Sequence, residues 1–145
     1  MFLTYTFLAI FSAGAMLTLQ VQHFALYPPV DRDGFARYVQ ANNRAAVFPA
    51  ILAGVLVFFF SVVLVFERPV FVPAWSALVA VLLNAVNIVS TIIWQGRLHG
   101  ELAATGYDER RVRLLIRTNW IRTAALLAQA VLALYCVYRG VSVAG

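Results

Sequence analysis

The chain has 145 residues, of which 63% are hydrophobic and 12% are charged, and its mean hydropathy is +0.84. The charged fraction is about half of the roughly 25% that soluble domains carry, which excludes an ordinary soluble protein and a disordered chain. The net charge of +5 comes from 11 arginines against 6 acidic residues that lie among them, a mixed pattern that argues against nucleic acid as a partner.

Four apolar stretches are each long enough to cross a bilayer as a helix, which takes about 20 residues. They run from about 2 to 26, 45 to 66, 74 to 94 and 120 to 138. The first has no basic residue ahead of it and no clear cleavage site, so we expect a retained span rather than a signal peptide. With short or moderate connections, the sequence predicts a single all-α domain over residues 1–145, an up-down-up-down bundle of four transmembrane helices.

The arginines predict the orientation of this bundle. Nine of the eleven lie in or beside the connection between the first two spans and the connection between the last two; only Arg68 and Arg139 lie on the other side. The positive-inside rule places the Arg-rich connections in the cytoplasm and both termini outside, in a bacterial cytoplasmic (inner) membrane. We expect these arginines to contact anionic membrane lipids.

The second and fourth spans are expected to begin as helices outside the membrane. Asp33 and Asp108 are suitable N-caps for these two helices. Pro49 is predicted to kink the second span, because proline removes one backbone hydrogen bond and clashes with the preceding turn.

Polar residues inside the spans are the best indication of function, because they are costly in a membrane. They dominate one helical face in each of three spans; these faces are Ser12, Met16, Gln20 and His23, then Asn84, Asn87, Thr91 and Gln95, and finally Asn119, Arg122, Leu126 and Gln129, of which only Met16 and Leu126 are apolar. Because consecutive spans run antiparallel, the stripe ends nearest the Arg-rich connections lie on the same side of the membrane. The sequence therefore predicts a pocket that opens to the cytoplasmic leaflet and suits a hydrophobic small molecule.

The chemistry of this pocket is predicted from its residue types. His23 and His99 are candidate acids or bases, and Arg122 with Asn119 would position an anionic or enolate-like oxygen. The candidate substrate-binding residues are Gln20, Asn87, Thr91, Gln95 and Trp120. A haem or metal ion held by the two histidines is an open alternative. No carboxylate lies within a span, which excludes a di-iron centre, and the lone Cys136 excludes a thiol redox pair.

Several motifs resemble those of an uncharacterised bacterial family of small four-helix membrane proteins. They are His23-x3-Tyr27, Asp33-Gly34-Phe35-x2-Tyr38, Trp94-x4-His99-x2-Leu102, Gly106-Tyr107-Asp108 and Arg117-Thr118-Asn119-Trp120-Ile121-Arg122-Thr123. That family is distantly similar to the anthrone-oxygenase-like group. The resemblance implies a membrane protein that acts on aromatic or polyketide-like molecules. Members of the family have a histidine at the position of Asn42 or Asn43, and they have an acidic residue near the position of Gly54. This chain lacks both, so the resemblance also implies a metal site with fewer ligands here.

Two classes of function follow. The first is an enzyme of oxygenase or isomerase type for a hydrophobic small molecule. The second is a non-catalytic subunit of a larger membrane protein complex, in which the same polar residues only connect the helices, at about 0.6 kcal/mol per contact. A small exporter is less favoured, because the sequence has neither an inverted repeat nor a coupling carboxylate inside a span.

Overall fold

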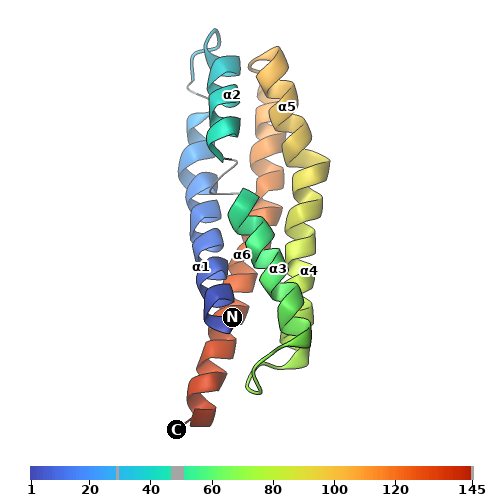
Figure 1. Ribbon diagram of the computed structural model, residues 1–145. Helices are drawn as coiled ribbons and strands as arrows, with labels where there is room; N and C mark the ends of the chain where they lie inside the picture. The colour runs from blue at the N-terminus through green and yellow to red at the C-terminus, as the bar shows by residue number, and fades with distance from the viewer. Residues whose placement is uncertain (29, 47–50, 145) are drawn as a thin grey trace.

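The computed structural model describes residues 1–28, 30–46 and 51–144, which form an elongated stack of helices (Figure 1). No strand occurs in these ranges, so the all-α prediction is confirmed for them. The α-helices are α1 (Phe2–Thr18), α2 (Phe35–Ala46), α3 (Leu52–Phe66), α4 (Ala74–Ser90), α5 (Gly96–Thr105) and α6 (Glu109–Ala144). Three short helical segments join them, η1 (Leu19–His23), η2 (Phe24–Leu26) and η4 (Thr91–Gln95).

Four of the helices pack in a closed ring. α1 contacts α3 and α6, α3 contacts α4, and α4 contacts α6. The chain runs upward in α1, downward in α3, upward in α4 and downward in α6, which leaves both termini at the lower end in Figure 1. Each of these helices is therefore antiparallel to its two neighbours in the ring.

Three helical runs are long and apolar enough to cross a membrane, namely Phe2–Leu26, Ala74–Thr105 and Glu109–Val143. The fourth predicted span is represented by α3, an apolar helix of 15 residues, which is shorter than a full crossing. The residues ahead of it, 47–50, lie outside the described part of the chain. The kink predicted at Pro49 falls among them.

The helix that contains the third predicted span, 74–94, continues beyond Trp94 through η4 and α5 to Thr105. Leu98 and Leu102 extend the apolar spacing, and both are buried where α5 packs against α2. The helix stops at Gly106, whose φ of 84° is readily adopted only by glycine. Asp108 then accepts a 2.8 Å hydrogen bond from the Arg111 backbone N–H, which confirms the predicted cap of α6.

The start of α2 differs in detail from the expectation. The helix begins at Phe35, and the backbone N–H groups of Phe35 and Tyr38 donate to the carbonyls of Arg32 and Gly34. Among the hydrogen bonds of the described residues, none uses the side chain of Asp33 as a cap. The N–H of Phe35 is satisfied by a backbone carbonyl of the preceding turn instead of by a side-chain cap.

The upper end of the molecule has its own apolar core. α2, α5 and the first turns of α6 enclose a cluster of buried side chains, and we call this part the head; its core residues are Phe24, Tyr27, Phe35, Val39, Leu98, Leu102, Val112 and Leu115. At 1.5 Å per residue, the 36 residues of α6 extend about 54 Å, well beyond a hydrocarbon layer of about 30 Å. The head therefore prolongs the ring of helices rather than lying within it.

The ring below the head is packed through small residues and a few polar pairs. Ala9, Ala77, Ala80 and Ala133 are buried between the helices and allow close approach. Asn84 donates to Ser61 Oγ at 3.3 Å, which ties α4 to α3. Large apolar side chains such as Leu3, Leu82 and Val131 instead point outward. An apolar exterior of this kind suits lipid as the surrounding solvent.

Candidate functional site

A cavity of about 350 Å³ lies where the head meets the ring of helices. Its wall is formed by the end of α1, by η1 and η2, by the end of α2, by η4 and α5, by α6, and by Ile51 just ahead of α3. The lining is mostly apolar and includes Met16, Leu19, His23, Phe24, Asn42, Asn43, Ile51, Thr91, Gln95, His99, Asn119 and Arg122. The volume falls within the range of about 300–1,000 Å³ that small-molecule sites occupy.

Two π-helical turns face this cavity from different helical runs. η1 contributes Leu19 and His23, and η4 contributes Thr91 and Gln95. A π turn holds one extra residue, which rotates the side chains that follow it relative to a regular α-helix, and such turns occur frequently at functional sites. Thr91 Oγ donates to the Asn87 carbonyl at 2.7 Å, a side-chain bond that competes with regular helix hydrogen bonding.

Arg122 is held by two asparagines from different helices. Its Nε donates to Asn87 Oδ1 on α4, and its Nη1 donates to Asn119 Oδ1 one turn earlier on α6, both at 3.1 Å. Asn119 Nδ2 donates in turn to Gln20 Oε1 at 2.7 Å, and Gln20 Nε2 donates to the Ile116 carbonyl at 3.3 Å. One polarised chain of hydrogen bonds thus connects α4, α6 and η1.

A second, smaller cavity shares Met16, Leu19 and Arg122 with the first. Its volume is about 30 Å³, and Ser12, Gly54 and Asn87 line it together with Arg122. A space of this size holds about two waters, each needing about 10–15 Å³. Arg122 therefore lines both a ligand-sized cavity and a water-sized one.

The two histidines lie on either side of an aromatic cluster. The ring of Tyr27 meets His23 edge-on at 5.2 Å and His99 at 6.4 Å between centroids, and Phe24 contacts both. Tyr38 Oη lies 3.5 Å from His23 Nδ1, at the long limit of hydrogen bonding. His23 Nε2, His99 Nδ1 and Gln95 Oε1 are buried and have no hydrogen-bond partner among the described residues.

Tyr27 is the fully buried centre of this cluster. Asn42 Nδ2 donates to its hydroxyl at 3.2 Å, which links η2 to the lower end of α2. Burial raises the pKa of Tyr27 above its ordinary range, an effect that nearby Tyr38 increases and the Asn42 hydrogen bond opposes. The phenol is therefore neutral near pH 7 and serves as a donor and acceptor rather than as a charge.

The structure places most of the predicted site residues at the cavity. His23, His99, Arg122, Asn119, Gln95 and Thr91 line it. Gln20 and Asn87 lie behind this lining and hold Asn119 and Arg122. Trp120 is on the outer face of α6 with 48% of its surface exposed, and it is absent from the lining.

Other members of the predicted stripes lie away from the cavity. Gln129 Nε2 donates to Tyr5 Oη at 3.4 Å, and Asn84 pairs with Ser61, so these polar residues connect helices lower in the ring. Cys136 is buried against Ser76, with Sγ and Oγ 3.5 Å apart. The stripes therefore divide into cavity residues at the upper end and bridging residues below.

The predicted metal ligands remain two imidazoles. Both histidines line the cavity, but the described residues contain no group of three or more His, Cys, Asp or Glu side chains that could hold a metal ion. A metal or haem bound here would have at most these two protein ligands and would need the rest of its coordination from elsewhere.

Sequence reasoning did not assign Tyr27 and Tyr38 to the site, and it named Asn42 without giving it a role there. A spacing of four residues was the available signal, because it separates His23 from Tyr27 and Tyr38 from Asn42 and places each pair on one helical face. What the spacing could not show is that the two faces meet, which depends on α2 folding back beside η1 and η2.

The described part of the chain is all-helical, with three candidate membrane-crossing helices and a mostly apolar cavity that a few polar side chains also line. No protein-family model, no curated protein and no solved structure matches the chain.

Proposed function

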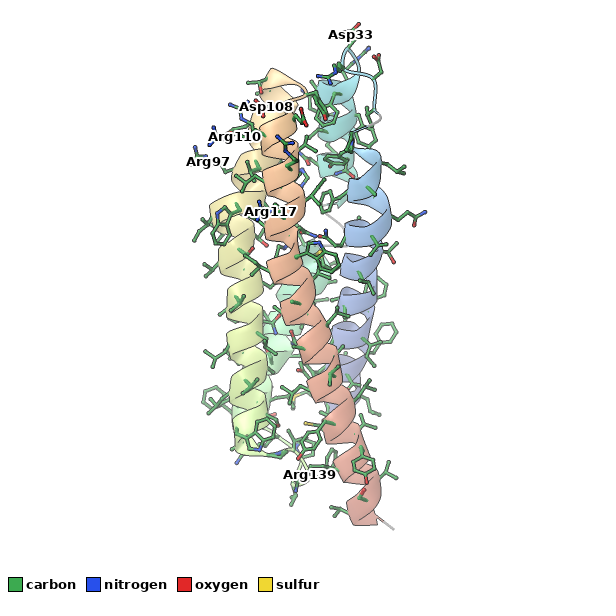
Figure 2. All side chains as sticks on the ribbon, turned by 180° about the vertical axis from the view of Figure 1, so that it is seen from behind. Asp33, Arg97, Asp108, Arg110, Arg117 and Arg139 are labelled. Atoms are coloured by element: carbon green, nitrogen blue, oxygen red, sulfur yellow. The ribbon has the colours of Figure 1, made fainter. Side chains whose placement is uncertain are left out.

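We propose that the protein is an integral protein of a bacterial cytoplasmic membrane with four crossings, one of which contains α3. The apolar exterior of the ring and the position of the arginines support this topology. Figure 2 shows Arg97, Arg110 and Arg117 projecting from the upper half of the molecule and Arg139 at the opposite end. By the positive-inside rule the head lies in the cytoplasm, among anionic lipid headgroups, and both termini lie outside.

Cysteine labelling tests this topology without removing any arginine. In a Cys136→Ser background, Glu109→Cys marks the head, and Ser142→Cys marks the opposite end; both parent side chains are exposed. A membrane-impermeant maleimide should label Ser142→Cys on intact spheroplasts and Glu109→Cys only after permeabilisation. The reverse pattern would contradict the proposed orientation.

The function that the site supports best is binding of a hydrophobic small molecule at the boundary between the head and the membrane. The observation that carries this proposal is a mostly apolar cavity of about 350 Å³ with Arg122, His23 and His99 at its wall. Apolar side chains favour a hydrocarbon or aromatic body, and the few polar groups fix its orientation.

We extend the proposal to catalysis of an isomerase or oxygenase type. Each histidine has a ring nitrogen without a partner in the described residues, so it can accept or donate a proton at a bound molecule. Arg122 can stabilise an oxygen that gains negative charge during such a proton transfer. In this scheme His23 and His99 move the proton, and Asn119 and Asn87 hold Arg122 in position.

A non-catalytic subunit of a membrane complex is the second candidate. The hydrogen bonds of Gln20, Asn87 and Asn119 favour this candidate, because they connect one helix to another. If that were their whole purpose, the cavity would be a gap in the packing and would hold no specific molecule.

A pair of adjacent substitutions separates the two candidates. Thr91→Trp fills the cavity, whereas Ile92→Trp adds the same indole on the outer surface, where Ile92 is exposed. Small molecules extracted from purified protein and identified by mass spectrometry should be present in wild type and Ile92→Trp and depleted in Thr91→Trp. Equal extracts from all three proteins would contradict a ligand site and favour the subunit.

A visible spectrum and metal analysis of the same preparations test the cofactor alternative. A Soret band or a stoichiometric metal that is lost in both His23→Ala and His99→Ala would assign the histidines as ligands. Retention of the signal in both variants would contradict that assignment.

A further inference from the structure

We infer that the molecule bound in the cavity is anionic, a hydrophobic compound that ends in a carboxylate or phosphate and whose oxyanion is the counter-ion of Arg122. This inference rests on the proposed ligand site and goes further by naming the chemical class of the ligand.

Arg122 lacks an acidic partner in the described part of the chain. All of the ion pairs there involve Arg97, Arg111 or Arg113, at the surface of the head. Arg122 lies farther along α6, within the span predicted at residues 120–138, and its side chain is partly buried. A charge in such a place is costly unless an opposite charge meets it, and two asparagine oxygens orient the guanidinium without neutralising it.

The guanidinium of Arg122 also has N–H groups that make no hydrogen bond to a described residue. Arginine has five N–H groups, of which the one on Nε and one on Nη1 are used by Asn87 and Asn119. No hydrogen bond within the described residues uses Nη2. The remaining N–H groups form the fork that binds carboxylate or phosphate oxygens in pairs, and they belong to a side chain that lines the cavity.

The surrounding amides hold this fork in place before any ligand arrives. Because Asn119 donates to Gln20 and Gln20 donates to the Ile116 carbonyl, the oxygen of Asn119 is left facing Arg122. The amides are thus oriented as acceptors for the arginine, and none of them supplies the missing negative charge. A site arranged in advance in this way loses little entropy when an oxyanion binds.

The rest of the cavity complements an acidic amphiphile. His23 Nε2 and His99 Nδ1 are buried without partners among the described residues and can supply further hydrogen bonds near the charged end. Met16, Leu19 and Ile51 provide apolar wall for a hydrocarbon or ring system. Among the described residues that line the cavity, none is acidic and would repel the anion.

Three probes with the same hydrocarbon chain test the inference, namely dodecanoic acid, dodecyl phosphate and the uncharged dodecanol. Binding is measured as the concentration-dependent rise in melting temperature of the protein in phosphatidylcholine nanodiscs. We expect the acid, the phosphate or both to stabilise the wild type, and dodecanol to bind at least tenfold more weakly. The stronger of the two acidic probes identifies the source of the oxyanion as a carboxylate or a phosphate.

Substitutions at two arginines of α6 provide the matched controls. Arg122→Gln should weaken the acidic probe by about 10- to 100-fold and abolish its advantage over dodecanol, because a charge-assisted hydrogen bond is lost. Arg122→Lys should retain part of the advantage. Arg117→Gln removes an exposed arginine outside the cavity lining and should leave binding unchanged.

The failures of the inference and of the proposed function are distinguishable. If dodecanol binds wild type as well as the acids do, and Thr91→Trp blocks all three, the ligand site stands and its anionic character is overturned. If no probe binds wild type better than Thr91→Trp, the ligand site itself fails. The comparison of acid with alcohol uses wild-type protein, so it holds even if Arg122→Gln does not fold.

Discussion

Asn119 on α6 donates a 2.7 Å hydrogen bond to Gln20 in η1, across 99 positions of sequence. Both side chains are buried, and the bond joins the first helical run to the last one at the level of the cavity. Through it, the orientation of Arg122 depends on a residue near the start of the chain.

A double-mutant cycle measures this bond. Gln20→Leu and Asn119→Leu should each destabilise the protein, and their coupling free energy should lie at about 0.6–1.7 kcal/mol, as for other hydrogen bonds between membrane helices. Reversible unfolding in mixed micelles gives the free energies of unfolding of the wild type, the two single variants and the double variant. Gln22→Leu, at an exposed position two residues away, is the control; additive effects in the cycle would show that the two amides do not interact.

The core of the head makes a second prediction. Phe35 is fully buried and meets Tyr27 and Tyr107 edge-on at centroid distances of 5.7 and 5.1 Å. Phe35→Ala should therefore lower the free energy of unfolding by about 3–5 kcal/mol. Phe66→Ala removes the same ring from a site that is 80% exposed and should change it by about 0.5 kcal/mol or less. Comparable losses from the two variants would contradict the described core.

Two glycines of the α5 region should respond oppositely to the same change. Gly106 has a φ of 84°, so Gly106→Ala should cost about 1–3 kcal/mol of stability. Gly100 is within α5, and an added Cβ there meets no atom within 4 Å. Gly100→Ala should stabilise the protein by about 0.4–1 kcal/mol, because alanine favours the helix. Thermal unfolding of both variants measures their changes in stability. Changes of the same sign would contradict the loop geometry.

The buried phenol of Tyr27 predicts a loss of stability at alkaline pH. Since burial raises its pKa in the fold, its contribution is complete below about pH 10, where the unfolded chain begins to ionise, and falls as the pH rises toward the folded value. Tyr27→Phe should remove up to about 1.4 kcal/mol per pH unit from the slope of stability above pH 10.

Chemical denaturation between pH 8 and 11.5 measures that slope. Tyr138→Phe, which removes an exposed phenol, should retain the wild-type slope. An unchanged slope in Tyr27→Phe would show that the phenol ionises as easily in the fold as in the unfolded chain.

Local chemistry accounts for what the sequence alone could predict. Long apolar runs require a helical fold in lipid, so the all-α class and three candidate spans followed from composition and length. The cap at Asp108 followed from residue type, because it satisfies a backbone N–H within its own turn. The spacing of Asn119, Arg122, Thr91 and Gln95 also placed them on the faces that line the cavity.

Tertiary structure decided the rest, because it depends on which faces meet. The third helical run extends to Thr105 with Leu98 and Leu102 buried against α2, and the apolar spacing of these two residues does not show which helix they would meet. Tyr27 became the centre of the histidine cluster only when α2 folded back beside η2. Trp120 is one helical step of about 100° from Asn119, and only the packing of α6 decided that Asn119 is buried and Trp120 lies on the outer surface.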